Sequence, residues 1–272
     1  MDTMLKNEDR ENRRRNAGGV IMRERDASPW TALLGVMPLL AGALTVAVGH
    51  YPYPDNNLDG RKYLAYMLPR HVAEVQAIAW SVAVLAISAF FVLLARAHAR
   101  ARGRMGLPEI VMTVGAAMFG GLQLVVTGLY AGAALFARGY PAFGSTPSDL
   151  RQISFMWVSL NSLYVVSLLP LASVWIAVVY ANRAHPVLPR ALGGWMAVVV
   201  AVVNTANIAT LFITTGKWSA GCVIPFTIHA AATFLWTAAA GFVLWRRART
   251  PSGPGRDRPR TLVSSAADFE DS

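Results

Sequence analysis

Six long runs of apolar residues, separated by short polar connections, dominate the chain. They cover residues 30–51, 71–97, 108–137, 151–181, 191–215 and 222–245. Each run has the roughly 20 residues that a helix needs to cross a hydrocarbon layer of about 30 Å. A backbone in lipid must satisfy its own hydrogen bonds, and the strands of membrane barrels are shorter and alternate in polarity. The pattern therefore predicts an all-α, polytopic membrane bundle of six transmembrane helices.

Both ends of the chain are polar and flank a single membrane domain. Residues 1–26 are charged and poor in apolar residues, and residues 248–272 are rich in Pro, Gly, Ser and charge. Segments of this composition bury too little apolar surface to fold. We expect a disordered basic arm over 1–26, the membrane domain over 27–247 and a disordered tail over 248–272.

Positive charge alternates between the connections. Most of the 25 Lys and Arg residues lie in the arm, in the second and fourth connections and in the tail. Positive residues favour the cytoplasm, so both termini are expected inside, in an N-in/C-in arrangement. Anionic lipid then accounts for the net charge of +10, and no nucleic acid is needed as a partner. The Ala, Arg and Gly bias is typical of a high-GC bacterium, which predicts the bacterial inner (cell) membrane.

Glu74 is the one carboxylate that lies well inside an apolar run. An ionisable group in a membrane is energetically expensive and usually faces the bundle interior. A carboxyl group buried in apolar surroundings favours its protonated form and can act as a general acid. His71 lies on the same helical face three residues earlier. Glu74 and His71 are therefore candidate catalytic residues, and Asp149, at the outer start of the fourth run, is a third.

Other polar and aromatic residues gather in the predicted outer halves of the runs. The candidate substrate-binding residues among them are Trp80, Gln123, Tyr130, Trp157, Asn161, Tyr164, Asn204, Asn207, His229 and Trp236. If their faces converge, they line a polar pocket that opens toward the outer leaflet. The alternative is that they only join helices through hydrogen bonds, each worth roughly 0.6 kcal/mol.

Metal, cofactor and packing motifs are weak. The single Cys222 excludes an intramolecular disulfide and a cysteine metal cluster. His50, His71 and His229 lack the spacing of a metal site, and we expect neither a metal nor a cofactor. The step from Gly128 to Gly132 is typical of close helix packing, either within a monomeric bundle, which we favour, or in a homo-oligomer. Pro170 is expected to interrupt the fourth helix.

The last third of the chain carries a set of motifs over about residues 186–248. They are Leu188-Pro189-Arg190 followed by Gly-Gly-Trp195, the loop Thr-Thr-Gly-Lys-Trp-Ser-Ala-Gly221, and Phe226, Trp236 and Leu244-Trp-Arg-Arg. With these motifs the segment resembles a group of small actinobacterial membrane proteins that lack an assigned activity. In the group the loop reads Lys-Thr-Gly-Pro-Phe-x-Trp-x-Gly, so the Lys is displaced here. The resemblance implies a six-helix membrane fold and no particular function.

Two classes of function fit these features. The architecture is similar to the compact integral-membrane terpenoid cyclases, and this likeness implies acid catalysis on an isoprenoid or lipid-like molecule with Glu74 as general acid. Those cyclases use a second acidic residue on another helix, whereas Asp149 is the nearest substitute here. The alternative is a non-enzymatic carrier or binding protein for a small hydrophobic molecule, or an accessory subunit of a membrane complex. In both classes the expected partners are a hydrophobic small molecule and membrane lipids.

Overall fold

The computed structural model describes residues 30–48, 58–68 and 71–249, and these residues form helices without a strand. Six helical stretches among them are long and apolar enough to cross a membrane. They are the first helix (Trp30–Val48), α3 (Val72–Arg102), α4 (Leu107–Gly139), α5 (Pro147–Val166) with α6 (Leu168–Ala184), η1 (Ala191–Met196) with α7 (Ala197–Ile208) and η2 (Ala209–Phe212), and α8 (Val223–Arg249). The all-α class and the six apolar helices are thus confirmed. His50, the 1–26 arm and all but the first two residues of the 248–272 tail lie outside the described residues.

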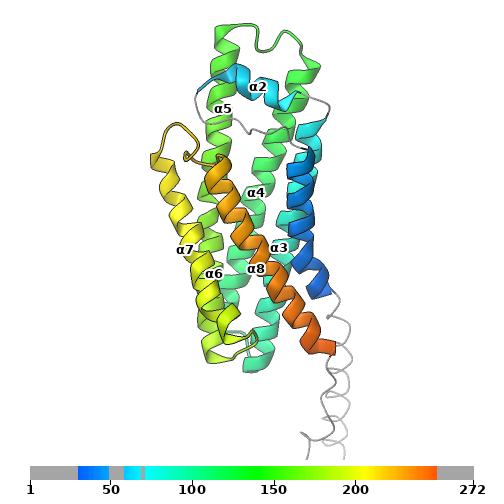
Figure 1. Cartoon of the computed structure of the whole chain (residues 1–272), viewed down its shortest axis with the longest axis vertical. Coiled ribbons are helices and arrows are strands. Elements are labelled where there is room, and N and C mark those ends of the chain that lie inside the picture. The colour runs from blue at the N-terminus through cyan, green and yellow to red at the C-terminus, as the bar shows by residue number, and fades with distance from the viewer. Residues whose placement is uncertain (1–29, 49–57, 69–70, 250–272) are drawn as a thin grey trace, which may run out of the picture.

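The long helices run along the longest axis of the molecule, and the short helix α2 (Gly60–Met67) lies across one end of them (Figure 1). α2 begins after Asp59, whose carboxylate accepts a hydrogen bond of 3.1 Å from the amide of Arg61, as an N-cap does. The ring of Tyr63 stacks on Trp157 of α5 at 4.8 Å between centroids. The apolar pattern does not predict α2, because only one face of this short helix is apolar. We call this end of the bundle the α2 end.

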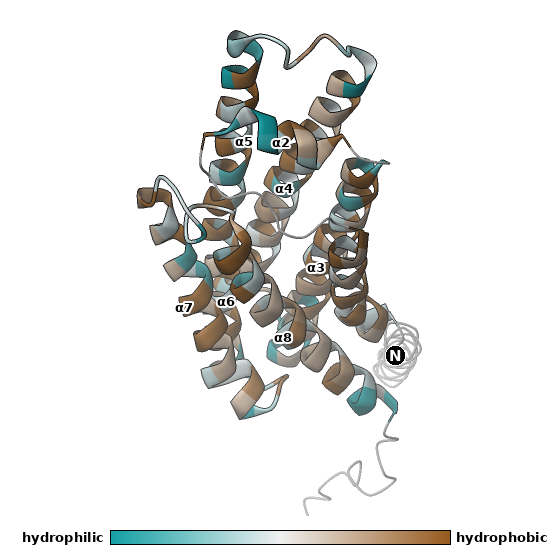
Figure 2. Cartoon of the chain, turned by 45° about the horizontal axis from the view of Figure 1, so that its top comes forward, coloured by the Kyte–Doolittle hydropathy of each residue, from teal (hydrophilic) through white to brown (hydrophobic). Residues whose placement is uncertain are grey.

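Large apolar side chains cover the outside of the bundle. Phe155 is 76% exposed and Ile78 is 66% exposed, although both belong to long apolar helical stretches. Figure 2 shows hydrophobic residues along the helices and hydrophilic residues concentrated toward the ends. An apolar surface of this extent is rare on a monomeric soluble protein and fits contact with lipid tails.

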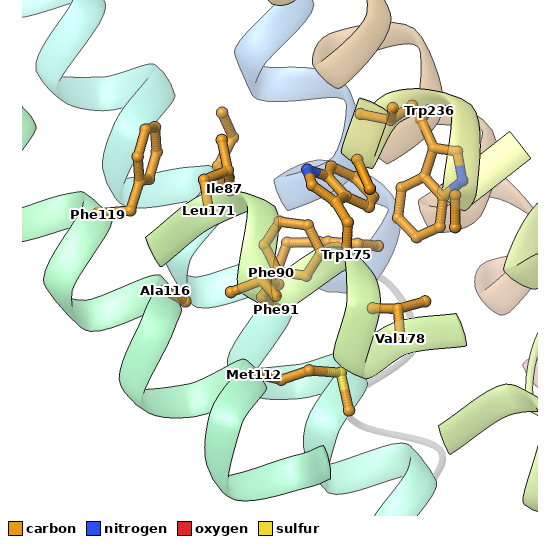
Figure 3. Packing of buried hydrophobic residues seen from close by; sticks show 14 of the residues in the cluster. Ile87, Phe90, Phe91, Met112, Ala116, Phe119, Leu171, Trp175, Val178 and Trp236 are labelled. Atoms are coloured by element: carbon orange, nitrogen blue, oxygen red, sulfur yellow. The ribbon is translucent and has the colours of Figure 1, made fainter. Parts of the chain in front are cut away.

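A cluster of buried aromatic rings lies away from the α2 end, where α3, α6 and α8 meet (Figure 3). The ring of Trp175 stands edge-on to Phe91 at 4.8 Å and to Trp236 at 4.4 Å between centroids. All three rings are buried, and edge-to-face pairs of this kind add to the gain from burial. The Trp236 indole also donates to the Leu192 carbonyl at 2.9 Å, which ties α8 to the π-helical turn η1.

The fourth apolar stretch is interrupted, as Pro170 predicts. Its helix breaks at Ser167, between α5 and α6, three residues before the proline. Proline has no amide hydrogen and its ring clashes with the carbonyl four residues earlier, which belongs to Val166. The break turns the Ser167 hydroxyl into a buried bonding partner for a neighbouring helix, as described below.

The glycine contacts correct one expectation. A Cβ atom at Gly128 or Gly132 would meet nothing within 4 Å, so this step does not pack against another helix of the described chain. The close approach lies instead between the first helix and α8. A Cβ at Gly35 would lie 3.0 Å from the Cα of Gly241, and 2.7 Å from the Thr237 carbonyl oxygen. Two facing glycines therefore let these helices touch through their backbones.

Candidate functional site: a cavity at the α2 end

A cavity of about 620 Å³ lies between the helices at the α2 end. Its wall comes from the second half of the first helix, the beginning of α3, the second halves of α4 and α5, the first half of α8 with Gly221 before it, and α2. The volume falls within the range of roughly 300–1,000 Å³ that is usual for ligand pockets. Every contributing helix segment except α2 belongs to the half that the sequence predicts to be the outer one.

The lining is mainly aromatic and aliphatic. Its aromatic residues are Tyr66, Trp80, Tyr130, Trp157, Tyr164, Phe226 and Phe234. Its polar residues are Thr45, Gln76, Thr127, Asn161 and Thr227, and the others are small or aliphatic. Among the described residues, no Lys, Arg, His, Asp or Glu lines the cavity. The site therefore suits an uncharged ligand, because nothing in its wall would pair with an ionised group.

Gln76 ties together four elements beside the cavity. Its amide nitrogen donates to the Tyr66 hydroxyl at 3.1 Å and to the Thr45 carbonyl at 3.3 Å. Its amide oxygen accepts a hydrogen bond from the Tyr130 hydroxyl at 3.0 Å. These bonds join α3 to α2, the first helix and α4. The sequence analysis did not select Gln76, although an amide inside an apolar run was a usable signal.

A second chain of hydrogen bonds runs behind Trp80. Its indole donates to the Gln123 amide oxygen at 2.9 Å, and the Gln123 amide nitrogen donates to the Ser167 hydroxyl at 2.6 Å. Ser167 in turn donates to the Tyr164 carbonyl at 2.5 Å. The Trp80 ring thus faces the cavity while its polar atom is bonded to the helices behind it, so α3, α4 and the α5–α6 break share one fixed geometry.

The threonine hydroxyls of the lining are also bonded. Those of Thr45, Thr127 and Thr227 each donate to the carbonyl four residues earlier on their own helix. An apolar ligand would therefore leave these donors satisfied.

Trp157 stands at the centre of an aromatic cluster below α2. Tyr63 stacks on it, and Tyr66 and Tyr130 approach its ring edge-on at 5.9 and 6.2 Å between centroids. The cluster joins α2, α4 and α5, and offset or edge-on aromatic pairs of this kind are worth about 0.5–1.5 kcal/mol each beyond burial. It gives the α2 end of the cavity a rigid aromatic wall.

Five of the ten predicted binding residues line the cavity, namely Trp80, Tyr130, Trp157, Asn161 and Tyr164. The other five, which are Gln123, Asn204, Asn207, His229 and Trp236, do not. The lining residues that the sequence analysis missed include Tyr66, Phe226, Phe234 and the small residues of the first helix. Aromatic residues in an apolar run give no signal that separates a cavity wall from a core.

The five predicted binding residues that do not line the cavity serve packing and bonding between helices. Gln123 lies behind Trp80, and Trp236 belongs to the core at the other end. Asn204 donates to the Val200 carbonyl of its own helix at 2.8 Å and to the Thr233 hydroxyl of α8 at 3.5 Å, and Asn207 donates to the Pro225 carbonyl of α8 at 2.9 Å. The His229 ring stands edge-on to Tyr164 at 5.8 Å between centroids. Buried amides in an apolar bundle turn to the nearest backbone carbonyl, which sequence spacing alone does not show.

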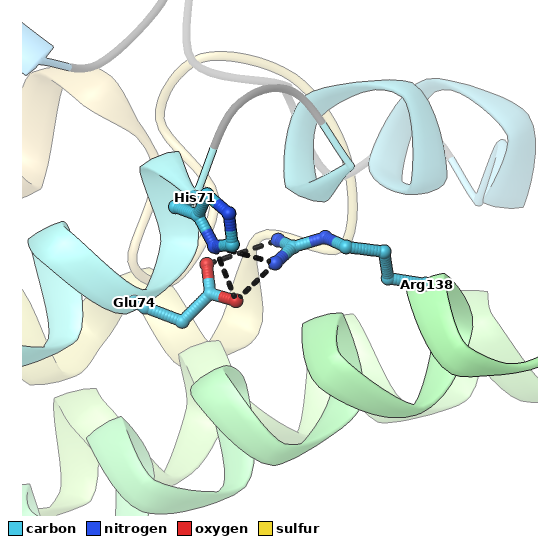
Figure 4. A network of polar contacts seen from close by, with 3 residues as sticks. All are labelled: His71, Glu74 and Arg138. Carbon is cyan, nitrogen blue, oxygen red and sulfur yellow. Dashed lines mark hydrogen bonds and ion pairs between the residues drawn. The ribbon is translucent and has the colours of Figure 1, made fainter.

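The predicted catalytic residues lie outside the cavity wall. Both carboxylate oxygens of Glu74 accept hydrogen bonds from Arg138, at 2.5 and 3.0 Å (Figure 4). His71 is exposed in a left-handed conformation before α3, and its Nδ1 lies 2.8 Å from Nη1 of Arg138. Asp149 accepts hydrogen bonds of 3.3 Å from the amides of Gly144 and Thr146, in a capping box at the start of α5. The sequence analysis missed Arg138 as the partner because it comes from another helix.

Comparisons with known proteins give no match: no family model fits the chain, and no curated protein or solved structure is significantly similar to it. Within the described ranges, no group of three or more His, Cys, Asp or Glu side chains is placed to hold a metal ion. The function of the protein is therefore inferred from the cavity and the residues that line it.

Proposed function

We propose that the protein is a multi-pass membrane protein, with six spanning helices and cytoplasmic termini, that binds an uncharged hydrophobic small molecule in the cavity at the α2 end. The length and composition of the six apolar helices support the spanning arrangement. Exposed cations at the end opposite α2, such as Arg100, Arg183 and Arg247, support a cytoplasmic location of that end. The Ala, Arg and Gly content supports a bacterial inner membrane.

One observation carries the binding function: a cavity of about 620 Å³ between apolar helices has an aromatic and aliphatic wall with no Lys, Arg, His, Asp or Glu among the described residues. Of its polar groups, Gln76 and the three threonines already have hydrogen-bond partners within the protein, whereas the buried Tyr164 hydroxyl has none among the described residues. An ionised ligand would lose its hydration without gaining a partner, whereas an apolar ligand would gain contact with aromatic rings.

An enzyme of the terpenoid-cyclase type is the second candidate. The rings of Trp80, Trp157 and Tyr164 in the cavity wall favour it, because aromatic faces stabilise cationic intermediates. The position of Glu74 does not add support, since both of its oxygens contact Arg138 and it is not part of the wall. The geometry therefore supports a binding or carrier protein better than a cyclase with Glu74 as general acid.

Mass spectrometry of the protein purified in lipid nanodiscs tests the binding function. The parent protein is expected to retain a co-purifying apolar molecule. Ala77→Phe places a ring in the cavity, since Ala77 is buried and lines it, and should remove that molecule. Ala117→Phe is the matched control, because Ala117 is exposed on α4 and does not line the cavity. Equal occupancy in the parent and in Ala77→Phe, with both folded, would contradict binding in this cavity.

Glu74→Gln separates the two candidate functions. Cells that express the parent or this variant, together with its neighbouring genes, are compared for terpenoid products. A product that appears with the parent and disappears with Glu74→Gln, at equal amounts of folded protein, favours acid catalysis. Retention of the bound molecule without any parent-dependent product favours the binding protein.

A further inference from the structure

The first helix and α8 form a V whose arms separate toward the α2 end (Figure 1). The arms meet at Gly35 and Gly241, where a Cβ on either glycine would lie 3.0 Å from the Cα of the other. One step further along, the Phe234 ring fills the space beside Gly42, at 2.7 Å from a Cβ there. Beyond that ring the cavity wall has Ala43, Thr45, Val46 and Ala47 on one arm and Val223, Phe226, Thr227, Ala230 and Ala231 on the other. Phe226, the one large side chain of this set, lies against Trp80 and Tyr164, at 5.1 and 5.6 Å between ring centroids.

Exposure of the lining shows where the cavity opens. The exposed lining residues are Ala43, Val46, Ala47, Thr227 and Ala231, and all five belong to the two arms of the V. The lining residues of α3, α4 and α5 are buried or half-buried. The opening between the arms therefore faces sideways, toward the surface that carries the exposed apolar side chains of the bundle, and its edges are formed by small residues.

We infer that the gap between the first helix and α8 is a lateral entrance, through which the cavity takes up an uncharged molecule dissolved in the lipid bilayer. This inference rests on the proposed membrane-spanning arrangement and deepens the proposed binding function, because it names the source of the ligand. A molecule that enters here never crosses water, so a strongly apolar compound reaches the site at its high concentration in lipid. The glycine contact at Gly35 and Gly241 holds the closed end of the V while the other end admits the ligand.

The route can be tested by cysteine labelling on α3, where three neighbouring positions have different surroundings. In a Cys222→Ala background, Ala77→Cys places a thiol in the cavity wall and Ile78→Cys places one on the exposed apolar face. Ala83→Cys is the packed control, because Ala83 is fully buried in the core and does not line the cavity. Vesicles that contain each variant are treated with a membrane-soluble pyrene maleimide or with a charged trimethylammonium thiosulfonate. Rates are expressed relative to Ile78→Cys with the pyrene reagent, because thiols react slowly at any position within lipid.

The lateral entrance predicts that Ala77→Cys reacts with the pyrene maleimide and not with the charged reagent, while Ala83→Cys reacts with neither. Adding Ala47→Trp or Ala231→Trp should slow the labelling of Ala77→Cys by about tenfold, the factor for roughly 1.4 kcal/mol of added barrier. Neither tryptophan should change the labelling of Ile78→Cys. The control Ala117→Trp on α4 should slow the labelling of neither Ala77→Cys nor Ile78→Cys. Two blocking positions on different helices keep the test valid if one of the variants fails to fold.

Faster reaction of Ala77→Cys with the charged reagent would place the entrance on the water side and overturn the inference. Unchanged labelling in both folded tryptophan variants would overturn it as well. Failure of the proposed function gives a different result. Lateral labelling without any co-purifying molecule would support the entrance and contradict the proposed binding function. A co-purifying molecule without lateral labelling would support the binding function and contradict the entrance.

Discussion

The carboxylate of Glu74 on α3 and the guanidinium of Arg138 on α4 form a two-contact ion pair at the α2 end, with Nη1–Oε1 at 2.5 Å and Nη2–Oε2 at 3.0 Å. Their side chains are 18% and 29% exposed, so the pair is partly shielded from solvent. It clamps the first turn of α3 to the last turn of α4, just beside the bonds that Gln76 makes to Tyr130. The pair thus acts on the helices that carry the cavity wall without entering the cavity.

A double-mutant cycle measures this clamp. Glu74→Gln and Arg138→Gln are each expected to lower the free energy of unfolding by a modest and similar amount, because solvent screens a pair that is partly exposed. The double variant should lose about as much as either single one, because the same interaction is lost in each case. Unfolding is followed by circular dichroism in mild detergent with added SDS. Losses that simply add would show that the two side chains do not stabilise the protein through each other.

Gln123 is expected to matter for stability and not for ligand contact. Gln123→Leu leaves the Trp80 indole and the Ser167 hydroxyl without their partner, which should cost about 1–3 kcal/mol. Adding Trp80→Phe removes one orphaned donor, so the double variant should lose less than the sum of the two single variants. The same detergent unfolding assay measures both. A stable Gln123→Leu protein that no longer retains the bound molecule would instead indicate that Gln123 contributes to ligand binding.

Two glycines with opposite surroundings give a paired test of helix packing. Gly35→Ala should destabilise the protein by about 1–3 kcal/mol, since the new methyl group meets the Thr237 carbonyl oxygen at 2.7 Å. Gly128→Ala adds a methyl group in open space and should be neutral or stabilising by up to about 1 kcal/mol, from helix propensity. Thermal unfolding in nanodiscs compares them. A loss at Gly128 similar to that at Gly35 would reveal a partner on the Gly128–Gly132 face, such as a second copy of the chain.

The proposed orientation predicts opposite labelling at the two ends of the bundle. Leu58→Cys and Ser148→Cys, both exposed at the α2 end, should react with an impermeant maleimide added to intact cells. Met105→Cys, exposed in the turn between α3 and α4, should react only after the cells are lysed. A reporter fused after Arg247 should be cytoplasmic. The opposite labelling pattern would contradict the proposed orientation. It would mean that both termini are outside and that the cavity lies in the inner half of the bilayer.

Half of the ten binding residues that the sequence pattern predicted belong to the candidate site. Trp80, Tyr130, Trp157, Asn161 and Tyr164 were selected because polar and aromatic residues gather in the same half of the predicted helices, and all five line the cavity. The rest of the lining carries no such signal. Phe226 and Phe234 are ordinary apolar residues of a helix, and only their position opposite the first helix makes them part of a wall.

The number and extent of the apolar helices follow from the sequence by itself. A helix satisfies its own backbone hydrogen bonds, and the length of the apolar run predicts the length of the helix. Pro170 likewise marks its break locally, through a missing amide hydrogen. Partners across helices were decided only by the tertiary structure. Glu74 meets Arg138 rather than a ligand, and Gly35 meets Gly241 while Gly128 stays open, because these contacts depend on how helices far apart in the chain are turned and crossed. In an apolar bundle every helix face is apolar, so hydropathy leaves that rotation undetermined, and close packing with paired hydrogen bonds selects it.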